Sequence, residues 1–477
     1  MTTLDVDVAV IGAGTAGLSA RRQVEKAGKR PVMIESGRYG TTCAREGCMP
    51  SKLLVAAADA KHAVDGASRF GVRVEAARVD GAAVLARVRA ERDGFVGPVL
   101  RLTERIPSEE RLRGEARFLD RTTLAVGEDI RVRARAVVIA SGSSPWVPPP
   151  FDAISEHVDV SADVFEWPAL PRSLAVIGTG IIALELGQAL HRLGVEVAFF
   201  NPFDELGPFT SPTLQRASRA LYSRELELHL GVTETSARVV RGGVRIGWVE
   251  DGARHERTFE RVLVAAGRRP NLAALDLEKS GLPLDAQGKP PWDRRTCQCG
   301  DSPIFMAGDA IGRRQLLHEA SDEGHIAGAN AASFPDVTAH VRRAALAIAF
   351  TDPQIAIVGR SFAELAHGEI TTGEVSYEEQ GRARVMGANA GLVELYAERA
   401  SCRLLGAEML GPRVEHLAHL LAWTVQQEMT VQECLSMPFY HPTLEEGLRK
   451  ALIALAKKLD VVGGCRAEDL PDECPGT

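Results

Sequence analysis

Two glycine-rich turns, each set between a short apolar strand and a helix, constrain this fold more than any other feature. The first turn is GAGTAG at 12–17. It follows an apolar run at 6–11 and precedes a helical stretch at 18–27 and a strand at 31–34. The second turn begins GTG at 178–180 and has the same neighbours. The repeated order of strand, turn, helix and strand predicts two α/β units, each with a parallel sheet.

Glycines at these positions suit a dinucleotide. They allow a tight turn, they let a pyrophosphate approach the N-terminus of the following helix, and an acid after the next strand can bind a ribose hydroxyl. Glu35 is such an acid in the first unit, and the same spacing places Asn201 in the second unit. We therefore predict two Rossmann-like dinucleotide-binding domains. The alternative is a turn that only packs helix on strand.

The residues after Asn201 bear on which nucleotide binds in the second unit. Asp204 and Glu205 follow closely, and no Lys or Arg stands among them to hold a 2′-phosphate. The pattern favours NAD(H) over NADP(H).

A pair of cysteines lies between the first unit and the helical region after it. Cys43 and Cys48 have four residues between them, and Gly47 gives the backbone the freedom to close the pair into a small disulfide ring. A helix that begins at Cys48 would favour its thiolate. The pattern is typical of a redox-active disulfide, although buried thiols or half of a zinc site are alternatives.

The remaining cysteines do not strengthen a metal interpretation. A zinc site needs further Cys or His ligands at short spacing, and none lies near the pair, so we expect no metal. Cys297 and Cys299 are expected to be free thiols, and Cys465 and Cys474 lie in a tail rich in Gly, Pro and acids.

Composition excludes several classes of function. With 477 residues, the chain is too long for one core, and two to four domains are expected. A net charge of −7 gives no basic surface for nucleic acid or anionic membrane, and no apolar run is long enough to span a bilayer. Eight cysteines in so long a chain do not form a disulfide framework, so a cytoplasmic location is expected.

The rest of the chain completes the expected domain order. Small residues follow strands at Ser141 and Gly267, Asp309 follows a strand at 304–307, and an α+β pattern begins near 342. Near the C-terminus, His441 precedes a proline in an extended or turn segment, and Glu446 at a helix start could orient its ring. By itself, such a histidine is usually structural.

Together these stretches resemble the pyridine nucleotide–disulfide oxidoreductases, the flavoenzyme family that includes the dihydrolipoamide dehydrogenases, glutathione reductases and mercuric reductases. The motifs TCAREGCMPSK at 42–52 and HPTLEE at 441–446 are most similar to the dihydrolipoamide dehydrogenases. Arg45 and Glu46 depart from the uncharged residues that are usual between the two cysteines. Ala183 replaces a usual Gly, and Phe439 replaces a second His.

The resemblance implies an α/β fold with two Rossmann-like domains and a C-terminal α+β dimerisation domain. The expected ranges are 1–150 (FAD-binding, first part), 151–267 (NAD(P)-binding), 268–338 (FAD-binding, second part) and 339–477 (dimerisation).

The resemblance also implies roles for individual residues. Cys43 would exchange with the substrate, Cys48 would be the thiolate next to the flavin, and His441 with Glu446 would be an acid–base pair supplied by the other subunit of a homodimer. Lys52 would pair with Glu185 beside the flavin. The expected FAD ligands are Gly12, Gly14, Gly17, Glu35, Thr42, Lys52, Ala116, Ser141, Asp309, Leu317 and His318. The expected NAD ligands are Gly178, Gly180, Glu185, Asn201 and Gly267.

The implied reaction is the oxidation of dihydrolipoamide to lipoamide with NAD⁺, through FAD and the Cys43–Cys48 disulfide. A 2-oxoacid dehydrogenase complex would be the larger partner. The alternative within the family is an NAD(P)H-dependent reductase of another disulfide, a metal ion or a quinone. Mercuric reductase and the long-chain thioredoxin reductases are disfavoured, since both need a C-terminal cysteine pair unlike the one here. A flavoprotein that only binds other subunits would not need the four residues Cys43, Cys48, His441 and Glu446.

Overall fold

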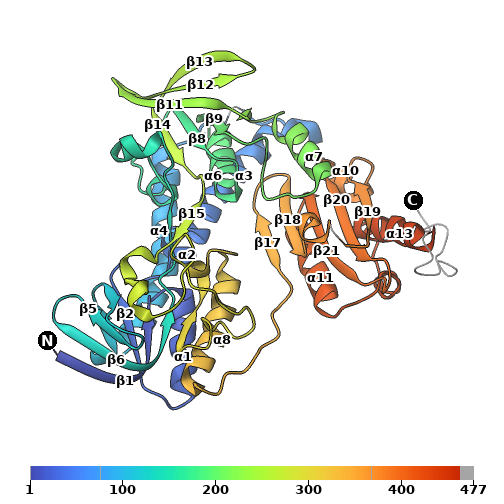
Figure 1. The fold of residues 1–477 in the computed structure, drawn as a ribbon. Coiled ribbons are helices and arrows are strands. Elements are labelled where there is room, and N and C mark those ends of the chain that lie inside the picture. Colours follow the sequence, from blue (N-terminus) through green and yellow to red (C-terminus); the bar gives the residue numbers. More distant parts are fainter. Residues whose placement is uncertain (1, 76, 367, 462–477) are drawn as a thin grey trace.

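The computed structural model describes residues 2–75, 77–366 and 368–461. Figure 1 shows three sheet-centred units: one around β1 and β6, one around β8 and β9, and a C-terminal one around β18 and β21. The helices α2, α3 and α4 lie between the first two units.

The first unit holds a seven-stranded sheet in the order β3-β2-β1-β6-β5-β4, with β16 also paired to β6. The strands β1, β2, β3, β6 and β16 are parallel, whereas β4 and β5 add an antiparallel edge. The strands are β1 Thr2–Ile11, β2 Pro31–Glu35, β3 Arg111–Arg113, β4 Ala116–Phe118, β5 Thr123–Val126, β6 Ile130–Ile139 and β16 Ile304–Met306.

The second unit has a parallel sheet in the order β10-β9-β8-β14 and an antiparallel sheet in the order β11-β12-β13. The short pair β7 Ser143–Pro145 and β15 Arg268–Pro270 lies where the chain leaves the first unit and where it returns. The strands of the second unit are β8 Ser173–Ile177, β9 Glu196–Asn201, β10 Glu227–Leu230, β11 Thr233–Val240, β12 Gly243–Glu250, β13 Ala253–Phe259 and β14 Arg261–Val264.

The third unit is a five-stranded antiparallel sheet in the order β17-β18-β21-β20-β19. Helix α11 packs against β18 and β21, and α13 packs against β19 and β20. The strands are β17 Leu346–Ala349, β18 Gln354–Gly359, β19 Ile370–Ser376, β20 Leu392–Glu398 and β21 Leu404–Gly411.

Helices connect and cover these sheets. The α-helices are α1 Thr15–Lys26, α2 Thr42–Arg45, α3 Cys48–Asp65, α4 Gly81–Glu104, α5 Ser161–Val164, α6 Ile181–Arg192, α7 Pro212–Tyr222, α8 Leu317–Ser333, α9 Phe362–Leu365, α10 Gly381–Val385, α11 Val414–Gln426, α12 Val431–Leu435 and α13 Glu445–Val461.

Small residues bring α1 and α8 together although they are far apart in sequence. A Cβ atom on Gly324 would lie 2.2 Å from the carbonyl oxygen of Ala16, and one on Gly328 would lie 2.3 Å from that of Ala20. Only glycine allows this approach. Gly308, which follows β16, also lies close to the glycine-rich turn, because a Cβ atom on it would lie 2.9 Å from the Cβ atom of Ala16.

The expected fold class is confirmed, since two parallel α/β units are followed by a C-terminal α+β unit. In the ranges that the structure describes, no helix combines the length and apolar character needed to cross a bilayer.

Candidate active site

The two cysteines of the motif lie on consecutive helices. Cys43 belongs to α2, and Cys48 is the first residue of α3, as the sequence predicts. Space at the link is limited, because a Cβ atom on Gly47 would lie 3.2 Å from the carbonyl oxygen of Thr42. Both cysteines are free thiols in this structure.

Arg45, one of the charged residues unusual for the family, has a local role beside this pair. Its guanidinium donates to the carbonyl oxygen of Tyr39 through Nη2 at 2.6 Å and through Nε at 3.1 Å. Its side chain passes over Gly40, where a Cβ atom would lie 2.8 Å from Nη2. The charge therefore anchors α2 to the preceding loop.

The electrostatics assign different protonation states to the two sulfurs. The hydrogen bond from Cys43 lowers the pKa of Cys48 to about 7, and the positive charge of Lys52 acts in the same direction. The same hydrogen bond, together with burial, raises the pKa of Cys43. The N-terminus of α3 further favours an anion at its first residue. The pair therefore holds a thiolate at Cys48 and a proton on Cys43.

Lys52 lies one turn beyond Cys48 and forms an ion pair with Glu185 of α6. Its Nζ lies 2.7 Å from Glu185 Oε2 and 2.9 Å from Oε1. The Glu185 side chain is 4% exposed, and its Oε1 also accepts a hydrogen bond of 2.8 Å from the backbone N–H of Phe350. The Phe350 ring lies 4.8 Å from Lys52 Nζ. One ion pair thus joins all three units.

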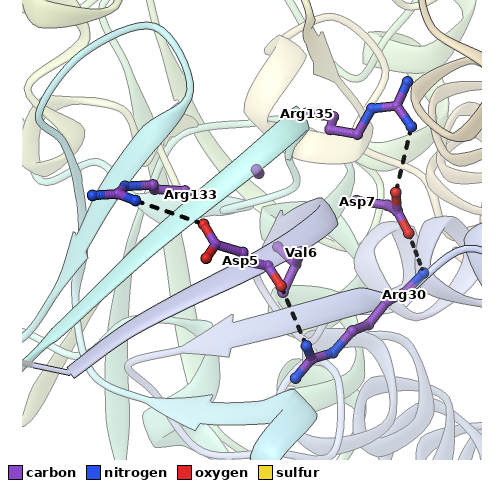
Figure 2. A pocket seen from close by; sticks show the side chains of 7 residues that line it. Asp5, Val6, Asp7, Arg30, Arg133 and Arg135 are labelled. Carbon is purple, nitrogen blue, oxygen red and sulfur yellow. Dashed lines mark hydrogen bonds and ion pairs between the residues drawn. The ribbon is translucent and has the colours of Figure 1, made fainter.

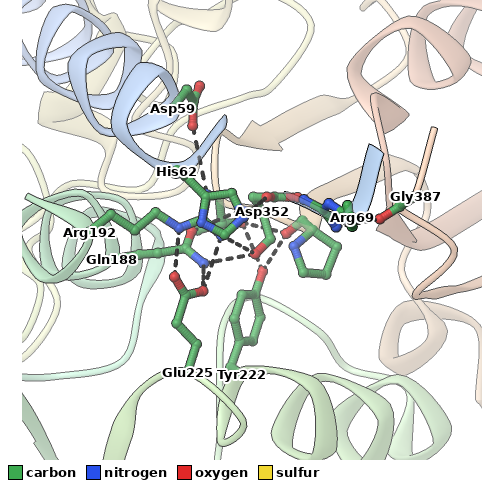
Figure 3. A network of polar contacts seen from close by, with 11 residues as sticks. Asp59, His62, Arg69, Gln188, Arg192, Tyr222, Glu225, Asp352 and Gly387 are labelled. Atoms are coloured by element: carbon green, nitrogen blue, oxygen red, sulfur yellow. Dashed lines mark hydrogen bonds and ion pairs between the residues drawn. The ribbon is translucent and has the colours of Figure 1, made fainter. Parts of the chain in front are cut away.

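The segment 350–353 of the third unit is bound along one face of α6. Gln188 accepts from the backbone N–H of Asp352 at 2.8 Å and donates to its carbonyl oxygen at 2.7 Å. Arg192 lies 3.1 Å from the Asp352 carboxylate, and His62 of α3 lies 3.8 Å from it. Figure 3 shows these side chains converging on Asp352. The network holds Phe350 in place against Glu185.

The first glycine-rich turn has the features of a pyrophosphate cradle. A Cβ atom on Gly12 or Gly17 would lie 2.2 Å or 1.9 Å from a backbone oxygen, so both positions require glycine for packing. A Cβ atom on Gly14 would meet nothing within 4 Å and would occupy space above the turn. Glu35 accepts from the backbone N–H of Ala13 at 2.7 Å.

Two polar residues follow the neighbouring parallel strands β6 and β16 of the first unit. Ser141 follows β6, and its Oγ is buried without a hydrogen-bond partner. Asp309 follows β16 and accepts from Ser143 Oγ at 2.8 Å, and Arg268 in turn donates to that hydroxyl at 2.8 Å. An unsatisfied hydroxyl, an open turn and an acid suit FAD, which supplies two-electron transfer when bound.

The other expected FAD ligands have diverse positions. Ala116 is buried at the start of β4, Thr42 is exposed at the start of α2, and Leu317 and His318 are exposed at the start of α8. Their roles stay predictions.

The second glycine-rich turn has the same construction. A Cβ atom on Gly178 would lie 2.6 Å from the carbonyl oxygen of Ala265, whereas one on Gly180 would meet nothing within 4 Å. Ala183 is fully buried at the position of the third glycine. Gly267, expected at the nucleotide, is exposed and has a φ of 123°. These features suit a second dinucleotide.

Asn201 lies at the end of β9 as expected, but its amide is directed inward. Nδ2 donates to Thr179 Oγ1 at 2.7 Å and to the carbonyl oxygen of Glu205 at 3.0 Å. Sequence reasoning also missed a base nearby, since Arg219 of α7 lies 2.6 Å from the Asp204 carboxylate. Arg219 follows Asp204 by 15 residues and lies on the next helix, so the residues adjacent to Asn201 in sequence do not reveal it.

His441 and Glu446 form the expected pair. His441 Nδ1 lies 2.9 Å from Glu446 Oε1, and the backbone N–H of Thr443 donates to Oε2 at 3.0 Å. Burial would raise the pKa of Glu446, but these two hydrogen bonds lower it below its ordinary value. Since a carboxylate accepts, the proton lies on Nδ1, and Nε2 is left as the base.

The chain does not bring this pair to its own cysteines. Figure 1 places α13, which carries Glu446, on the outer side of the C-terminal unit, well apart from α2. The His441 side chain is 58% exposed.

Other candidate groups lie apart from this site. Cys297 and Cys299 are buried free thiols in different core clusters, and burial raises both pKa values. Cys465 and Cys474 lie outside the described residues. No cluster of three or more His, Cys, Asp or Glu side chains suited to a metal ion occurs within the part of the chain that the structure describes.

A hollow on the first unit is distinct from the nucleotide sites. Figure 2 shows Asp5 and Asp7 of β1 facing Arg30, Arg133 and Arg135. The Asp7 carboxylate accepts from the backbone N–H of Arg30 at 2.9 Å and lies 3.6 Å from Arg135. Asp5 and Asp7 precede the C-terminal end of β1, where the glycine-rich turn begins. Dinucleotides bind at that end of a parallel sheet.

The site thus defines a redox protein with a dithiol and two dinucleotide cradles, and comparison with known proteins agrees. The model of the pyridine nucleotide-disulphide oxidoreductases matches residues 6–324, and the model of their dimerisation domain matches residues 345–452. The chain therefore belongs to the pyridine nucleotide-disulphide oxidoreductases, as its motifs suggest.

Individual relatives span almost the whole chain. The dihydrolipoyl dehydrogenase of Bacillus subtilis is 31% identical, over 94% of this chain and 98% of its own length. The mercuric reductase of Shigella flexneri is also 31% identical, over 96% of this chain and 82% of its own. The structure of LpdA from Mycobacterium tuberculosis has a TM-score of 0.79 at 23% identity, covering 94% of this chain and 99% of that one.

Membership of the family confirms several expectations. The cofactors are FAD and NAD(H), and the protein is a flavoprotein disulfide oxidoreductase. The matched dimerisation domain supports a homodimer that acts on a dithiol or disulfide.

Proposed function

We propose that this protein is an NAD⁺-dependent dihydrolipoyl dehydrogenase. The observation that carries the proposal is the placement of the dithiol, in which Cys48 begins α3, Cys43 lies on the preceding α2, and Lys52 follows one turn beyond Cys48 in an ion pair with Glu185. The B. subtilis relative supports the choice of dihydrolipoamide. The mercuric reductase relative makes reduction of a metal ion the second candidate.

The reaction begins with the Cys43–Cys48 disulfide. One thiol of dihydrolipoamide gives its proton to Nε2 of His441 and attacks Cys43 Sγ, which breaks the disulfide and releases the Cys48 thiolate. The second substrate thiol then attacks the mixed disulfide. Lipoamide leaves, Cys43 departs as a thiol with the proton of the second substrate thiol, and the imidazolium of His441 retains the first proton. Bound FAD would supply the two-electron chemistry by which the Cys43–Cys48 disulfide re-forms, the Cys43 proton is released and a hydride is delivered to NAD⁺.

Each protein group has a stated task in this scheme. Glu446 keeps His441 in the Nδ1–H tautomer and stabilises its cation. Lys52 lowers the pKa of Cys48, and Glu185 limits the motion of Lys52. His441 and Glu446 act on the cysteines of the partner subunit. The complete enzyme would serve a 2-oxoacid dehydrogenase complex in the cytoplasm, which cell fractionation and co-purification would test.

The deciding experiment is an anaerobic assay of the purified flavoprotein with dihydrolipoamide and either NAD⁺ or NADP⁺. We expect turnover with NAD⁺ that is lost in Cys43→Ser. The matched control is Cys434→Ala, which removes a free thiol of the third unit and should keep turnover.

Absence of turnover, with flavin still reduced rapidly by NADH, would overturn the lipoamide assignment. The same preparation would then be assayed with mercuric ion, other disulfides and quinones as oxidants of NADH or NADPH.

A further inference from the structure

The two nucleotide turns of this chain can be compared residue by residue, because they have the same spacing. In the first unit, Glu35 receives a hydrogen bond from the backbone N–H of Ala13, inside the glycine-rich turn. In the second unit, the equivalent Asn201 donates instead to the side chain of Thr179. Asn201 Nδ2 also donates to the carbonyl oxygen of Glu205, so both N–H groups of its amide are used within the protein.

The loop after Asn201 folds back over the second glycine-rich turn. Thr179 Oγ1 donates to the carbonyl oxygen of Glu205 at 2.7 Å, and the backbone N–H of Gly207 donates to the carbonyl oxygen of Thr179 at 2.8 Å. Asp204 therefore lies next to the turn that would hold the pyrophosphate. It follows the C-terminal end of β9, where a protein of this fold binds the ribose.

The Asp204 carboxylate is paired with a base from α7. Arg219 Nη2 lies 2.6 Å from Asp204 Oδ1 and donates to the Asp204 carbonyl oxygen at 2.7 Å. Both side chains are solvent-accessible, at 43% exposed for Arg219 and 69% for Asp204. An exposed pair of this kind is held weakly, so the guanidinium can take another anion if the carboxylate is removed.

We propose that Asp204 and Arg219, in place of Asn201, determine which nicotinamide nucleotide this protein accepts. Asp204 repels a 2′-phosphate and neutralises Arg219, which makes the site selective for NAD(H). Arg219 is a latent 2′-phosphate ligand, since its planar fork of donors matches a phosphate. The proposal deepens the NAD⁺ preference of the proposed function, whereas the nicotinamide nucleotide site itself follows from membership of the family.

The test measures binding, by isothermal titration calorimetry, of two adenosine probes to the flavin-loaded protein. Adenosine 2′,5′-bisphosphate carries the 2′-phosphate, and 5′-AMP lacks it. In Asp204→Asn, we expect the bisphosphate to bind about five- to tenfold more tightly, because one repulsive charge is lost and one guanidinium is released. Binding of 5′-AMP should change by less than about twofold.

Two further variants make the test decisive. In the double variant Asp204→Asn with Arg219→Gln, the gain should disappear. Glu234→Gln should have no effect on either probe. It breaks a comparable exposed pair with Arg254, 2.5 Å apart, on the antiparallel sheet of the same unit.

Either of two results would overturn the proposal: unchanged bisphosphate affinity in Asp204→Asn, or a gain that persists without Arg219. Because no substrate is turned over, failure here is separate from failure of the lipoamide assignment. In the assay with dihydrolipoamide, the ratio of kcat/KM for NADP⁺ to that for NAD⁺ should rise in parallel with the binding change.

Discussion

Lys52 Nζ lies 2.7 Å from Glu185 Oε2 although the two residues belong to different units of the chain. The lysine side chain is 31% exposed, whereas the carboxylate is buried and also accepts the backbone N–H of Phe350. The ion pair therefore fixes the helix of the dithiol, the helix of the second nucleotide turn and the third unit relative to one another.

Substitution of Lys52 alone should lower the stability of the protein more than substitution of Lys52 and Glu185 together. Lys52→Met leaves a buried carboxylate without its cation and should lower the free energy of unfolding by about 2–3 kcal/mol. Adding Glu185→Gln should recover much of this loss, because a neutral amide can still accept from Phe350. Urea unfolding of the single and double variants measures the coupling. Additive losses would contradict the pairing described here.

The hydrogen bond from Cys43 should control the reactivity of Cys48 in the reduced enzyme. Cys43→Ala removes the donor, so the thiolate becomes less stable and the pKa of Cys48 should rise from about 7 toward its ordinary value of 9.0. Cys43→Ser keeps an O–H donor and should show a smaller rise. The pH dependence of the rate of iodoacetamide modification, followed by mass spectrometry, gives the midpoint. An unchanged midpoint in Cys43→Ala would disprove this cause of the shift.

Two glycines of the first turn should respond differently to the same substitution. Gly14→Ala adds a methyl group that meets no protein atom within 4 Å, so the chain should fold but bind FAD poorly. Gly17→Ala places a Cβ atom 1.9 Å from the carbonyl oxygen of Gly12, so the strand and helix cannot pack. Circular dichroism and the flavin absorbance per chain distinguish the outcomes. A folded, flavin-loaded Gly17→Ala protein would contradict the structure.

Mixing two inactive variants tests whether the site is shared between subunits. A heterodimer of Cys48→Ser and His441→Gln chains contains one complete site if His441 acts on the partner's cysteines. Random reassortment should then restore about a quarter of the wild-type activity, since half of the dimers are mixed and each has one intact site of two. If each subunit uses its own histidine, every mixed dimer is inactive. Refolding the variants together, compared with each alone, provides the measurement.

Much of the site could be predicted because its signals are local. The glycines of both turns, the start of α3 at Cys48 and the pairing of His441 with Glu446 depend on residues close in sequence. Their backbone conformation and spacing leave few alternatives. The role of Arg45 could not be predicted in this way, because nothing in the motif indicates that its guanidinium binds the carbonyl oxygen of Tyr39.

The sequence by itself determined the classes of element, the two dinucleotide turns and the dithiol, because hydrophobic periodicity, glycine conformation and helix ends are short-range properties. Only the tertiary structure decided that Phe350 would hold Glu185, that Asn201 would turn inward and that Arg219 would meet Asp204. Each of these contacts joins segments whose separation is set by the packing of helices and sheets. Charge and hydrogen bonding act over a few ångströms in space, whatever the distance along the chain.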